Sequence, residues 1–238
     1  MDDKVIRSEN KIFLTRIGSE WGGLHLDMEL IPYKSLIISG GLAHDISFDI
    51  ELINKKQCYV IGVDPTRTSA KTVFKYCVNN FFRRKHFKLI RKAIHGKSNL
   101  TMCLGGPANT FLSPQGKKVK TISLDDLVFM YAGASLLKLD IEGSEFPAIE
   151  SLSTKFRMPQ VAIGFHVWLN SESDQYPNEG VPPSLYTSKD VLDAVQKIKK
   201  MGYKLVYEER ELRERIGQET LFIRNEFASK YHDIELVA

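Results

Sequence analysis

The stretch Leu136-Leu-Lys-Leu-Asp-Ile-Glu-Gly-Ser-Glu145 decides the fold that we expect for this chain. Its first residues form a nearly continuous apolar run, which is typical of a strand covered on both faces in a parallel sheet. Asp140 ends the run, and Gly143 permits a turn shortly after it. Open α/β sheets bind their ligands at the carboxyl ends of strands. The stretch therefore predicts an α/β fold with a site at Asp140.

Other apolar runs resemble this one and alternate with helical patterns. The runs are residues 36–38, 59–63, 100–104 and 161–165. Helix-start signals lie between them: Ser123 with Asp126 and Thr187 with Asp190 each have the spacing of a capping box. Strands that alternate with helices predict a doubly wound parallel sheet with right-handed crossovers. Residues 203–208 and 220–224 differ, because they read as two strands with no helix between them.

Composition bounds the class of protein. The 238 residues suit one large domain, and 43% hydrophobic and 26% charged residues are ordinary for a soluble protein. The net charge of +4 does not by itself imply a nucleic-acid partner. Three scattered cysteines, a polar N-terminus and no long apolar run favour a cytoplasmic protein with no membrane partner. We expect residues 1–34 to be an N-terminal extension or cap and residues 35–238 a single domain.

A glycine turn and an acidic turn follow the first two predicted strands. The first is Ser39-Gly-Gly-Leu-Ala-His-Asp-Ile-Ser47, and the second contains Asp64, about twenty residues later. Such an acid can accept the ribose hydroxyls of a nucleoside. The turn lacks a complete G-x-G-x-x-G pattern because Ala43 and Ser47 replace the later glycines, and a pyrophosphate needs bare amides there. A nucleoside cofactor without a pyrophosphate is therefore favoured.

Candidate catalytic groups gather after the fourth and fifth predicted strands. Asp140, Glu142 and Glu145 lie so close that at least one should have a raised pKa or an ionic partner, for which Lys138 is the nearest candidate. His166 should face the same crevice, and its ordinary pKa suits a general base. The predicted catalytic residues are Asp140, His166 and Glu142. These three residues also have the chemistry to hold a divalent metal ion, although we favour a site without metal.

Several of these motifs resemble one known family. K-x-D-I-E-G-x-E at residues 138–145 resembles the signature of FkbM-family methyltransferases. Trp21-Gly-Gly23, residues 39–49 and Val63-Asp-Pro-Thr66 resemble a related methyltransferase-like branch, so the resemblance covers essentially the whole chain. It implies a class I Rossmann-like fold, with a seven-stranded, mostly parallel sheet and an antiparallel edge strand. The strand pair at the C-terminal end agrees with that fold.

The resemblance also implies S-adenosylmethionine (SAM) as the cofactor. We expect the cofactor-binding residues to be Ser39, Gly40, Gly41, His44, Asp45, Ser47, Asp64, Pro65, Thr66, Gly105 and Asp125. In that assignment Asp64 holds the ribose, the glycine turn holds the methionine part, and Gly105 and Asp125 flank the adenine.

The implied reaction is transfer of a methyl group to a hydroxyl of a sugar or small metabolite. Two alternatives stay open: an oxidoreductase that uses NAD, and a SAM-binding protein without turnover. The second is motivated by departures from the family pattern, since the branch usually has Gly at Ala43, an acid at His44, and Glu-x-His where this chain has Gly164-Phe-His166. We expect the N-terminal segment and the polar loop 170–186 to set the acceptor.

Residues 81–95 form a basic stretch with interleaved aromatic residues. We interpret it as a solvated helix whose Phe and Ile residues pack inward. The alternative is an anion-binding surface for a phosphorylated sugar or a nucleic acid.

Overall fold

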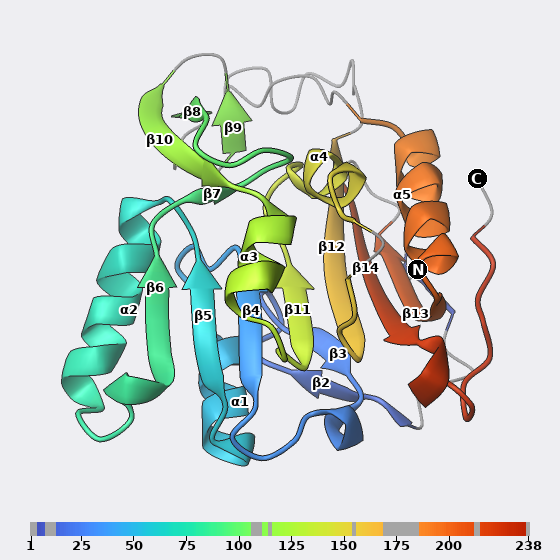
Figure 1. Ribbon diagram of the computed structural model, residues 1–238, viewed down its shortest axis with the longest axis horizontal. Helices are drawn as coiled ribbons and strands as arrows, with labels where there is room; N and C mark the ends of the chain where they lie inside the picture. Colours follow the sequence, from blue (N-terminus) through green and yellow to red (C-terminus); the bar gives the residue numbers. More distant parts are fainter. Residues whose placement is uncertain are drawn as a thin grey trace.

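An eight-stranded sheet forms the centre of the molecule (Figure 1). The computed structural model describes residues 4–7, 13–105, 111–113, 116–153, 156–168, 186–211 and 215–236. In sheet order the strands are β1 (Lys4–Arg7), β13 (Tyr203–Glu211), β14 (Arg215–Arg224), β12 (Gln160–Trp168), β11 (Leu136–Leu139), β4 (Leu36–Gly40), β5 (Tyr59–Val63) and β6 (Phe87–Ile90).

The parallel part of the sheet is doubly wound, as the sequence predicts. From β4 the chain moves outward to β5 and β6, and it then returns to β11 and β12 on the other side of β4. The winding therefore reverses between β4 and β11. Such a reversal opens a crevice at the carboxyl ends of the two strands, which is where open α/β sheets bind ligands.

The predicted C-terminal strand pair is confirmed, but the place of the antiparallel strand is corrected. β14 runs antiparallel to both β12 and β13, between which it is inserted, so it does not lie at the edge. The edge belongs to β1, an eighth strand from the N-terminal segment that pairs antiparallel with β13. An inserted position buries both faces of β14, and Leu221, Phe222 and Ile223 are all fully buried.

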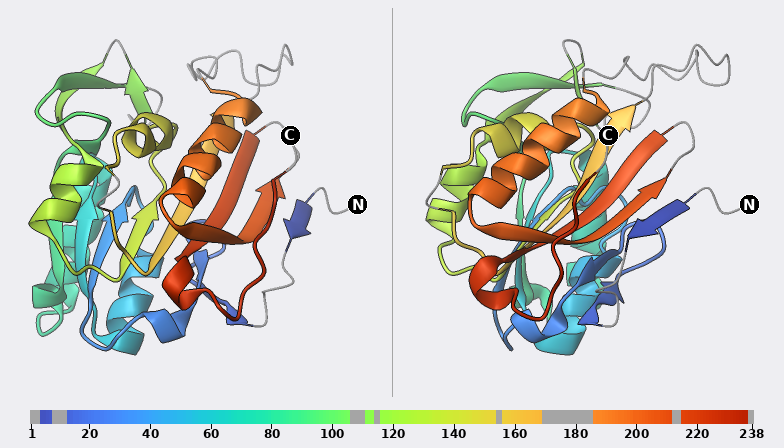
Figure 2. Two further views of the ribbon diagram at one scale, coloured as in Figure 1. Left: turned by 45° about the vertical axis from the view of Figure 1, so that its right-hand side comes forward. Right: turned by 90° about the vertical axis from the view of Figure 1, so that its right-hand side faces the viewer.

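Helices cover both faces of the sheet (Figures 1 and 2). They are α1 (Ser47–Lys56), α2 (Arg67–Asn79), α3 (Leu124–Met130), α4 (Glu145–Glu150) and α5 (Ser188–Lys200), with short 3-10 turns at Met28–Leu30, Arg84–His86 and Asn225–Phe227. One core contains Leu52 of α1 and Val73 of α2. The other contains Leu127 of α3, Ala148 of α4 and Val195 of α5.

The predicted capping box is confirmed in full at α5, and at α3 the Ser123 half of it forms. The Ser123 hydroxyl accepts the backbone N–H of Asp126 at the start of α3. Thr187 and Asp190 form a complete capping box at the start of α5. Capping of this kind satisfies N–H groups that have no partner within the helix.

Two predictions about the middle of the chain are wrong. Residues 100–104 do not supply the third strand of the main sheet. They lie in β8 (Thr101–Gly105), which joins a separate small sheet with β7 (Ala93–Ile94), β10 (Lys117–Ile122) and β9 (Phe111–Ser113). The third strand is instead β6, within the stretch predicted as a helix. Lys88, the one charged residue of β6, fits this position, because exposed sheet edges commonly carry lysine.

The N-terminal segment packs beside the main sheet. β2 (Thr15–Ile17) and β3 (Leu24–Leu26) form an antiparallel hairpin. Ile17 and Leu26 are fully buried in the same core as α1. Among the described residues, no helix combines the length and apolarity that a membrane crossing requires.

Candidate active site

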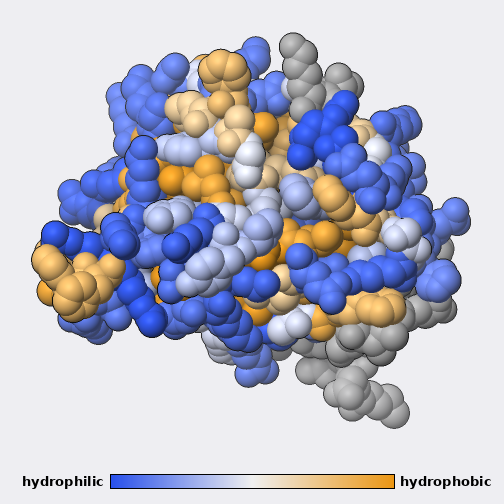
Figure 3. All heavy atoms as spheres, turned by 60° about the horizontal axis from the view of Figure 1, so that its bottom comes forward, coloured by the Kyte–Doolittle hydropathy of each residue, from blue (hydrophilic) through white to orange (hydrophobic). Residues whose placement is uncertain are grey.

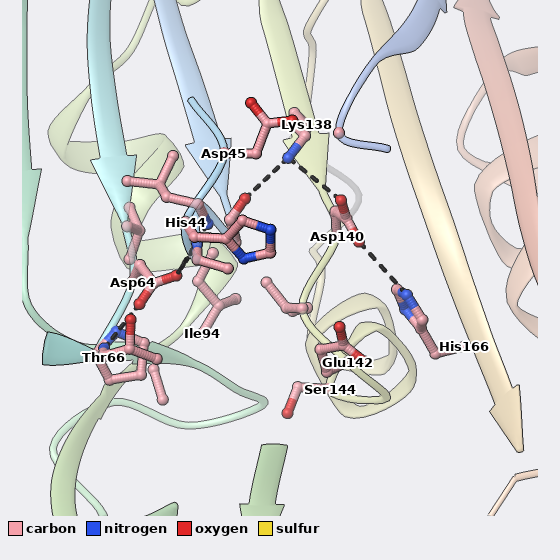
Figure 4. Close-up of a pocket in the computed structure, with 18 of the residues that line it drawn as sticks. His44, Asp45, Asp64, Thr66, Ile94, Lys138, Asp140, Glu142, Ser144 and His166 are labelled. Carbon is pink, nitrogen blue, oxygen red and sulfur yellow. Dashed lines mark hydrogen bonds and ion pairs between the residues drawn. The ribbon is translucent and has the colours of Figure 1, made fainter. Parts of the chain in front are cut away.

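A pocket opens where the winding of the sheet reverses. It comprises ≈ 1000 Å³ of space, including the part open to solvent. Its walls are formed by Trp21, Gly22, Gly41, Leu42, Ala43, His44, Asp45, Val63, Asp64, Pro65, Thr66, Ala93, Ile94, Leu104, Leu112, Lys138, Asp140, Ile141, Glu142, Ser144 and His166. Apolar side chains from the small sheet line one part, and charged side chains after β4, β5 and β11 line another (Figure 4).

The turn after β4 lies directly against the end of β11. Gly41 has a φ of +78°, and a Cβ built on it would lie 1.6 Å from the carbonyl oxygen of Asp140. Only glycine fits such an approach. The Lys138 ammonium donates to the Gly41 carbonyl oxygen at 2.8 Å, which ties the turn to β11 from the other side.

Asp64 fixes the same turn from β5. One of its carboxylate oxygens accepts the backbone N–H groups of Leu42 and Ala43, both at 2.9 Å. The other accepts the N–H of Thr66 at 2.7 Å. The carboxylate therefore organises two turns of the pocket wall, a role in addition to the ribose binding that we predict for it.

Ala43 adopts a backbone conformation that suits glycine, with φ at +42°. An L-residue in the left-handed region costs about 1–2 kcal/mol, of which the greater freedom of an unfolded glycine would cancel about 0.5–1 kcal/mol. We therefore expect Ala43→Gly to raise the free energy of unfolding by about 0.5–1 kcal/mol in urea titrations. Ala70→Gly, within α2, is the control and should lower it by a similar amount. A loss of stability in both variants would contradict this strain.

Three charged side chains of the pocket wall, Lys138, Asp140 and His166, form a chain of ion pairs (Figure 4). Glu145 extends this chain behind His166. Asp140 lies between Lys138, whose Nζ is 3.4 Å from Oδ2, and His166, whose Nε2 is 3.5 Å from Oδ1. On the far side of the imidazole, His166 Nδ1 lies 3.0 Å from Glu145 Oε1. Lys138 and Glu145 are buried, so this arrangement compensates charges that burial alone would disfavour. Lys138 is the ionic partner that the sequence indicates for Asp140.

Glu145 also shapes the turn that precedes it. Its two carboxylate oxygens accept the N–H groups of Ile141 and Gly143, each at 2.8 Å. Between them Glu142 is held at a φ of +54°, where a side chain costs about 1–2 kcal/mol. Strain of this kind persists where the surroundings over-determine it, and it directs the Glu142 carboxylate to the pocket wall.

The environment of His166 favours a role other than the predicted general base. Burial alone would lower the pKa of His166, but the nearby carboxylates, Glu145 first, raise it to about 10. The imidazole is then protonated at neutral pH, and it has no lone pair with which to take a proton. Its place between Glu145 and Asp140 suits a positioning residue, so Asp140 is the stronger candidate for a base.

This pKa predicts a pH-dependent contribution of His166 to stability. The folded-state pKa of about 10 lies above the unfolded value of about 6.5. The stabilisation is therefore complete below about pH 6.5 and disappears as the pH rises through about 10. Urea titrations should find His166→Gln less stable than the wild type at about pH 6, by about 1.4 kcal/mol for each unit of the pKa difference. The difference in the free energy of unfolding between the wild type and His166→Gln should become smaller at about pH 10. A difference that does not depend on pH would contradict a contribution from the ion pairs of His166.

A rigid turn between β2 and β3 brings Trp21 to the pocket. The Ser19 hydroxyl donates to Asp45 and accepts the N–H groups of Trp21 and Gly22, at 3.2 and 3.0 Å. The backbone N–H of Ser19 donates to the hydroxyl of Ser47 at 2.8 Å. Despite this fixed backbone, Trp21 is 91% exposed. The turn therefore presents an uncovered indole ring at the pocket wall.

The structure brings most of the predicted site residues together. Those in the pocket wall are Gly41, His44, Asp45, Asp64, Pro65, Thr66, Asp140, Glu142 and His166. Five others are not part of the wall: Ser39, Gly40, Ser47, Gly105 and Asp125. Ser39 and Gly40 lie within β4. The hydroxyl of Ser47 binds the N-terminal turn, and the Asp125 carboxylate accepts the N–H of Ser153 at 2.9 Å.

Gly105 ends β8 in the small sheet and lies outside the pocket wall. Leu104, its neighbour, does line the pocket, as do Leu112, Ala93 and Ile94. Sequence reasoning did not find these apolar residues, because no local pattern shows that a second sheet covers the crevice. Residues 169–185, which include nearly all of the predicted specificity loop, lie outside the described residues.

The charges at Asp140 do not favour a metal ion there. The Lys138 ammonium and the protonated His166 already lie 3.4 and 3.5 Å from its two carboxylate oxygens. A second cluster, His25, Glu209 and Glu219, has ligand atoms within 4.8 Å of one another. There the Arg16 guanidinium lies 3.1 Å from Glu219 and supplies the positive charge.

Comparison with known proteins identifies one family. The model of the methyltransferase FkbM domain matches residues 9–205. No curated protein matches the chain.

Methyltransferases of several kinds are among the solved structures to which the chain is similar. Precorrin-6y C5,15-methyltransferase from Geobacter metallireducens has 10% sequence identity and a TM-score of 0.45, with 83% of this chain and 85% of that chain covered. The methyltransferase domain of a bacterial protein, CtHen1-CN, has 14% identity and a TM-score of 0.47, with 80% and 90% covered. A mutant of the 16S rRNA (adenine(1408)-N(1))-methyltransferase from Catenulisporales acidiphilia, with its cosubstrate SAM, has 10% identity and a TM-score of 0.44, with 93% and 100% covered.

Proposed function

The chain belongs to the FkbM methyltransferase family, and on that premise we propose that it transfers the methyl group of SAM to a hydroxyl oxygen of a sugar or another small metabolite. Membership of this family favours methyl transfer over the alternative of an NAD-dependent oxidoreductase. The observation that carries the finer proposal is the position of Asp140, an acidic side chain at the floor of the pocket between two cationic groups.

The pocket has the chemistry to hold SAM. The cofactor supplies a methyl group that is already activated by a positively charged sulfur. Carboxylates of Asp45, Asp64 and Glu142 line the charged part of the wall and suit its hydroxyl and cationic groups. The apolar residues Ile94, Leu104 and Leu112 suit the adenine ring. Related proteins usually carry an acidic residue where this chain has His44. Here the neighbouring carboxylates alone would neutralise the cationic groups of SAM.

Asp140 is the proposed base for the acceptor. Its carboxylate would take the proton of the acceptor hydroxyl as that oxygen forms its bond to the methyl carbon. The carbon–sulfur bond of SAM would break in the same step, its electron pair would stay on sulfur, and S-adenosylhomocysteine would leave as a neutral thioether. The carboxylate would later release the proton to water. Lys138 and His166 keep the carboxylate in one place, with His166 held in turn by Glu145. Because the methyl group arrives activated, alignment of the reacting atoms is the main task of these residues.

Trp21 is the proposed contact for the acceptor. An exposed aromatic ring on a fixed turn suits the apolar face of a sugar ring. We expect Trp21→Ala to raise the KM for the acceptor roughly ten- to hundredfold, as loss of a large buried ring contact would. The KM for SAM should change little. Trp21→Phe keeps an aromatic face, so its KM for the acceptor should lie between those of the wild type and Trp21→Ala. An equal rise in the KM for SAM would place Trp21 at the cofactor instead.

The proposal is tested by calorimetry and by transfer of labelled methyl groups. Saturable SAM binding is expected, and NAD should not raise the thermal stability as SAM does. Label should then pass to a hydroxylated acceptor from a panel of sugars and metabolites. Saturable SAM binding without transfer to any acceptor would favour a binding protein that has lost turnover, as the departures at Ala43, His44 and Gly164 allow.

A further inference from the structure

The basic residues of this chain are unevenly distributed. Residues 65–124 contain 13 of the 33 lysines and arginines and neither Asp nor Glu. Because the net charge of the whole chain is only +4, the remaining residues are together acidic. Such an asymmetry attracts and orients a polyanionic surface.

The outer face of α2 combines this charge with large apolar side chains. Lys71, Phe74, Lys75 and Val78 have the spacing of one helix face. Phe74 is 70% and Val78 60% exposed, although α2 also buries Val73 on its inner face. The helix therefore carries apolar residues on two sides, of which the protein core uses one.

The turn after α2 extends the same surface. Phe81 and Phe82 are 59% and 87% exposed, and their rings meet edge to face at a centroid distance of 5.8 Å. The Arg84 guanidinium lies 4.0 Å from the Phe81 ring centroid. Arg83, Arg84 and Lys85 are all exposed. We call Lys71, Phe74, Lys75, Val78 and residues 81–85 the α2 patch.

Figures 1 and 3 place this surface at one outer end of the molecule. In Figure 1, α2 ends at the lower left, at the far end from the small sheet. In the space-filling view a hydrophobic area lies at the left end, surrounded by hydrophilic residues. Exposed apolar areas with a polar rim mark sites of interaction with another surface.

We propose that the α2 patch docks on the surface of an anionic phospholipid bilayer. Aromatic rings settle in the interfacial layer of a bilayer, and clustered lysine and arginine side chains bind anionic headgroups. A single-stranded nucleic acid would instead need a groove that follows its backbone, whereas the α2 patch lies on a helix and a turn at the edge of the molecule (Figure 1), and its aromatic rings are exposed. This inference does not depend on the proposed reaction, and it replaces the expectation of no membrane partner with contact at a membrane surface.

The α2 patch is separate from the pocket. α2 begins after Thr66, which lines the pocket, and its 13 residues span about 20 Å before the exposed phenylalanines. None of the α2 patch residues is part of the pocket wall, so docking through the patch does not require the pocket residues themselves.

The test is cosedimentation of the whole chain with lipid vesicles. We expect binding to vesicles of phosphatidylcholine with phosphatidylserine, no binding to phosphatidylcholine alone, and release at high salt. Phe81→Ala/Phe82→Ala should weaken binding about tenfold or more. Arg83→Glu/Arg84→Glu should abolish it.

Phe129→Ala is the matched control. Phe129 on α3 is 87% exposed, as Phe82 is, but follows Asp125 and Asp126 rather than a basic segment. Its removal should leave binding unchanged, and all variants should keep the thermal midpoint of the wild type. Failure of the wild type to bind anionic vesicles, or binding that the α2 patch variants do not weaken, would overturn the proposal. Binding of a polyuridine probe that depends on the α2 patch, without vesicle binding, would overturn it in favour of a nucleic acid.

Discussion

Asp140→Asn is expected to lower kcat/KM for methyl transfer by about 10²–10⁴-fold, the usual contribution of a general base. The amide has nearly the same shape as the carboxylate but cannot accept the acceptor proton. It also leaves the Lys138 ammonium without the carboxylate that lies 3.4 Å away. Steady-state kinetics with labelled SAM would measure the loss.

The control is Lys138 itself, because Lys138→Met removes the same ion pair and keeps the carboxylate. If the carboxylate acts as the base, Asp140→Asn loses turnover while its affinity for SAM, measured by calorimetry, stays close to that of the wild type. Lys138→Met should lose stability more than turnover, since Lys138 is buried and also holds the Gly41 carbonyl oxygen. Equal losses of turnover in the two variants would show that the ion pair, rather than the base, is what matters.

Gly41→Ala should have the largest effect on the cofactor site. Its methyl group would lie 1.6 Å from the Asp140 carbonyl oxygen, so the turn after β4 or the end of β11 would have to move. We expect a loss of about 2–5 kcal/mol in the free energy of unfolding, from backbone strain and overpacking together. Calorimetry should detect no SAM binding, because the displaced turn lines the pocket.

Gly143→Ala separates strain from collision. Gly143 also has a positive φ, at +91°, but a Cβ built on it meets nothing within 4 Å. This variant should lose only about 0.5–1 kcal/mol in the free energy of unfolding, because the reduced freedom of the unfolded chain offsets part of the strain, and it should still bind SAM. If Gly41→Ala lost no more stability than Gly143→Ala and still bound SAM, the close approach of the turn after β4 to the end of β11 would not be the reason for glycine at position 41.

Much of the fold follows from local sequence patterns. Continuous apolar runs located β4, β5, β11 and β12, and the two capping boxes located α3 and α5. The patterns failed at the edge of the sheet. β6 contains only four residues, of which Lys88 alone is polar, and so short a pattern is also compatible with a helix. The choice between them depends on pairing with β5, which no local window contains.

Site residues that directly follow a predicted strand could be located from the sequence. Contacts between segments that are far apart in the sequence could not. Asp140, Glu142 and Asp64 follow strands directly, so their position at the crevice follows from the fold. The role of His166 required tertiary knowledge, because its pKa depends on Glu145 across two elements. The apolar wall from Leu104 and Leu112 likewise depends on a small sheet that folds over the crevice.

The most direct measurement is transfer of a labelled methyl group from SAM to a panel of sugars and hydroxylated metabolites, with wild type and Asp140→Asn compared side by side. The predicted result is label on an acceptor oxygen with the wild type and a loss of about 10²–10⁴-fold with the variant. Label on nitrogen, or transfer that proceeds equally well without the Asp140 carboxylate, would contradict the proposed reaction.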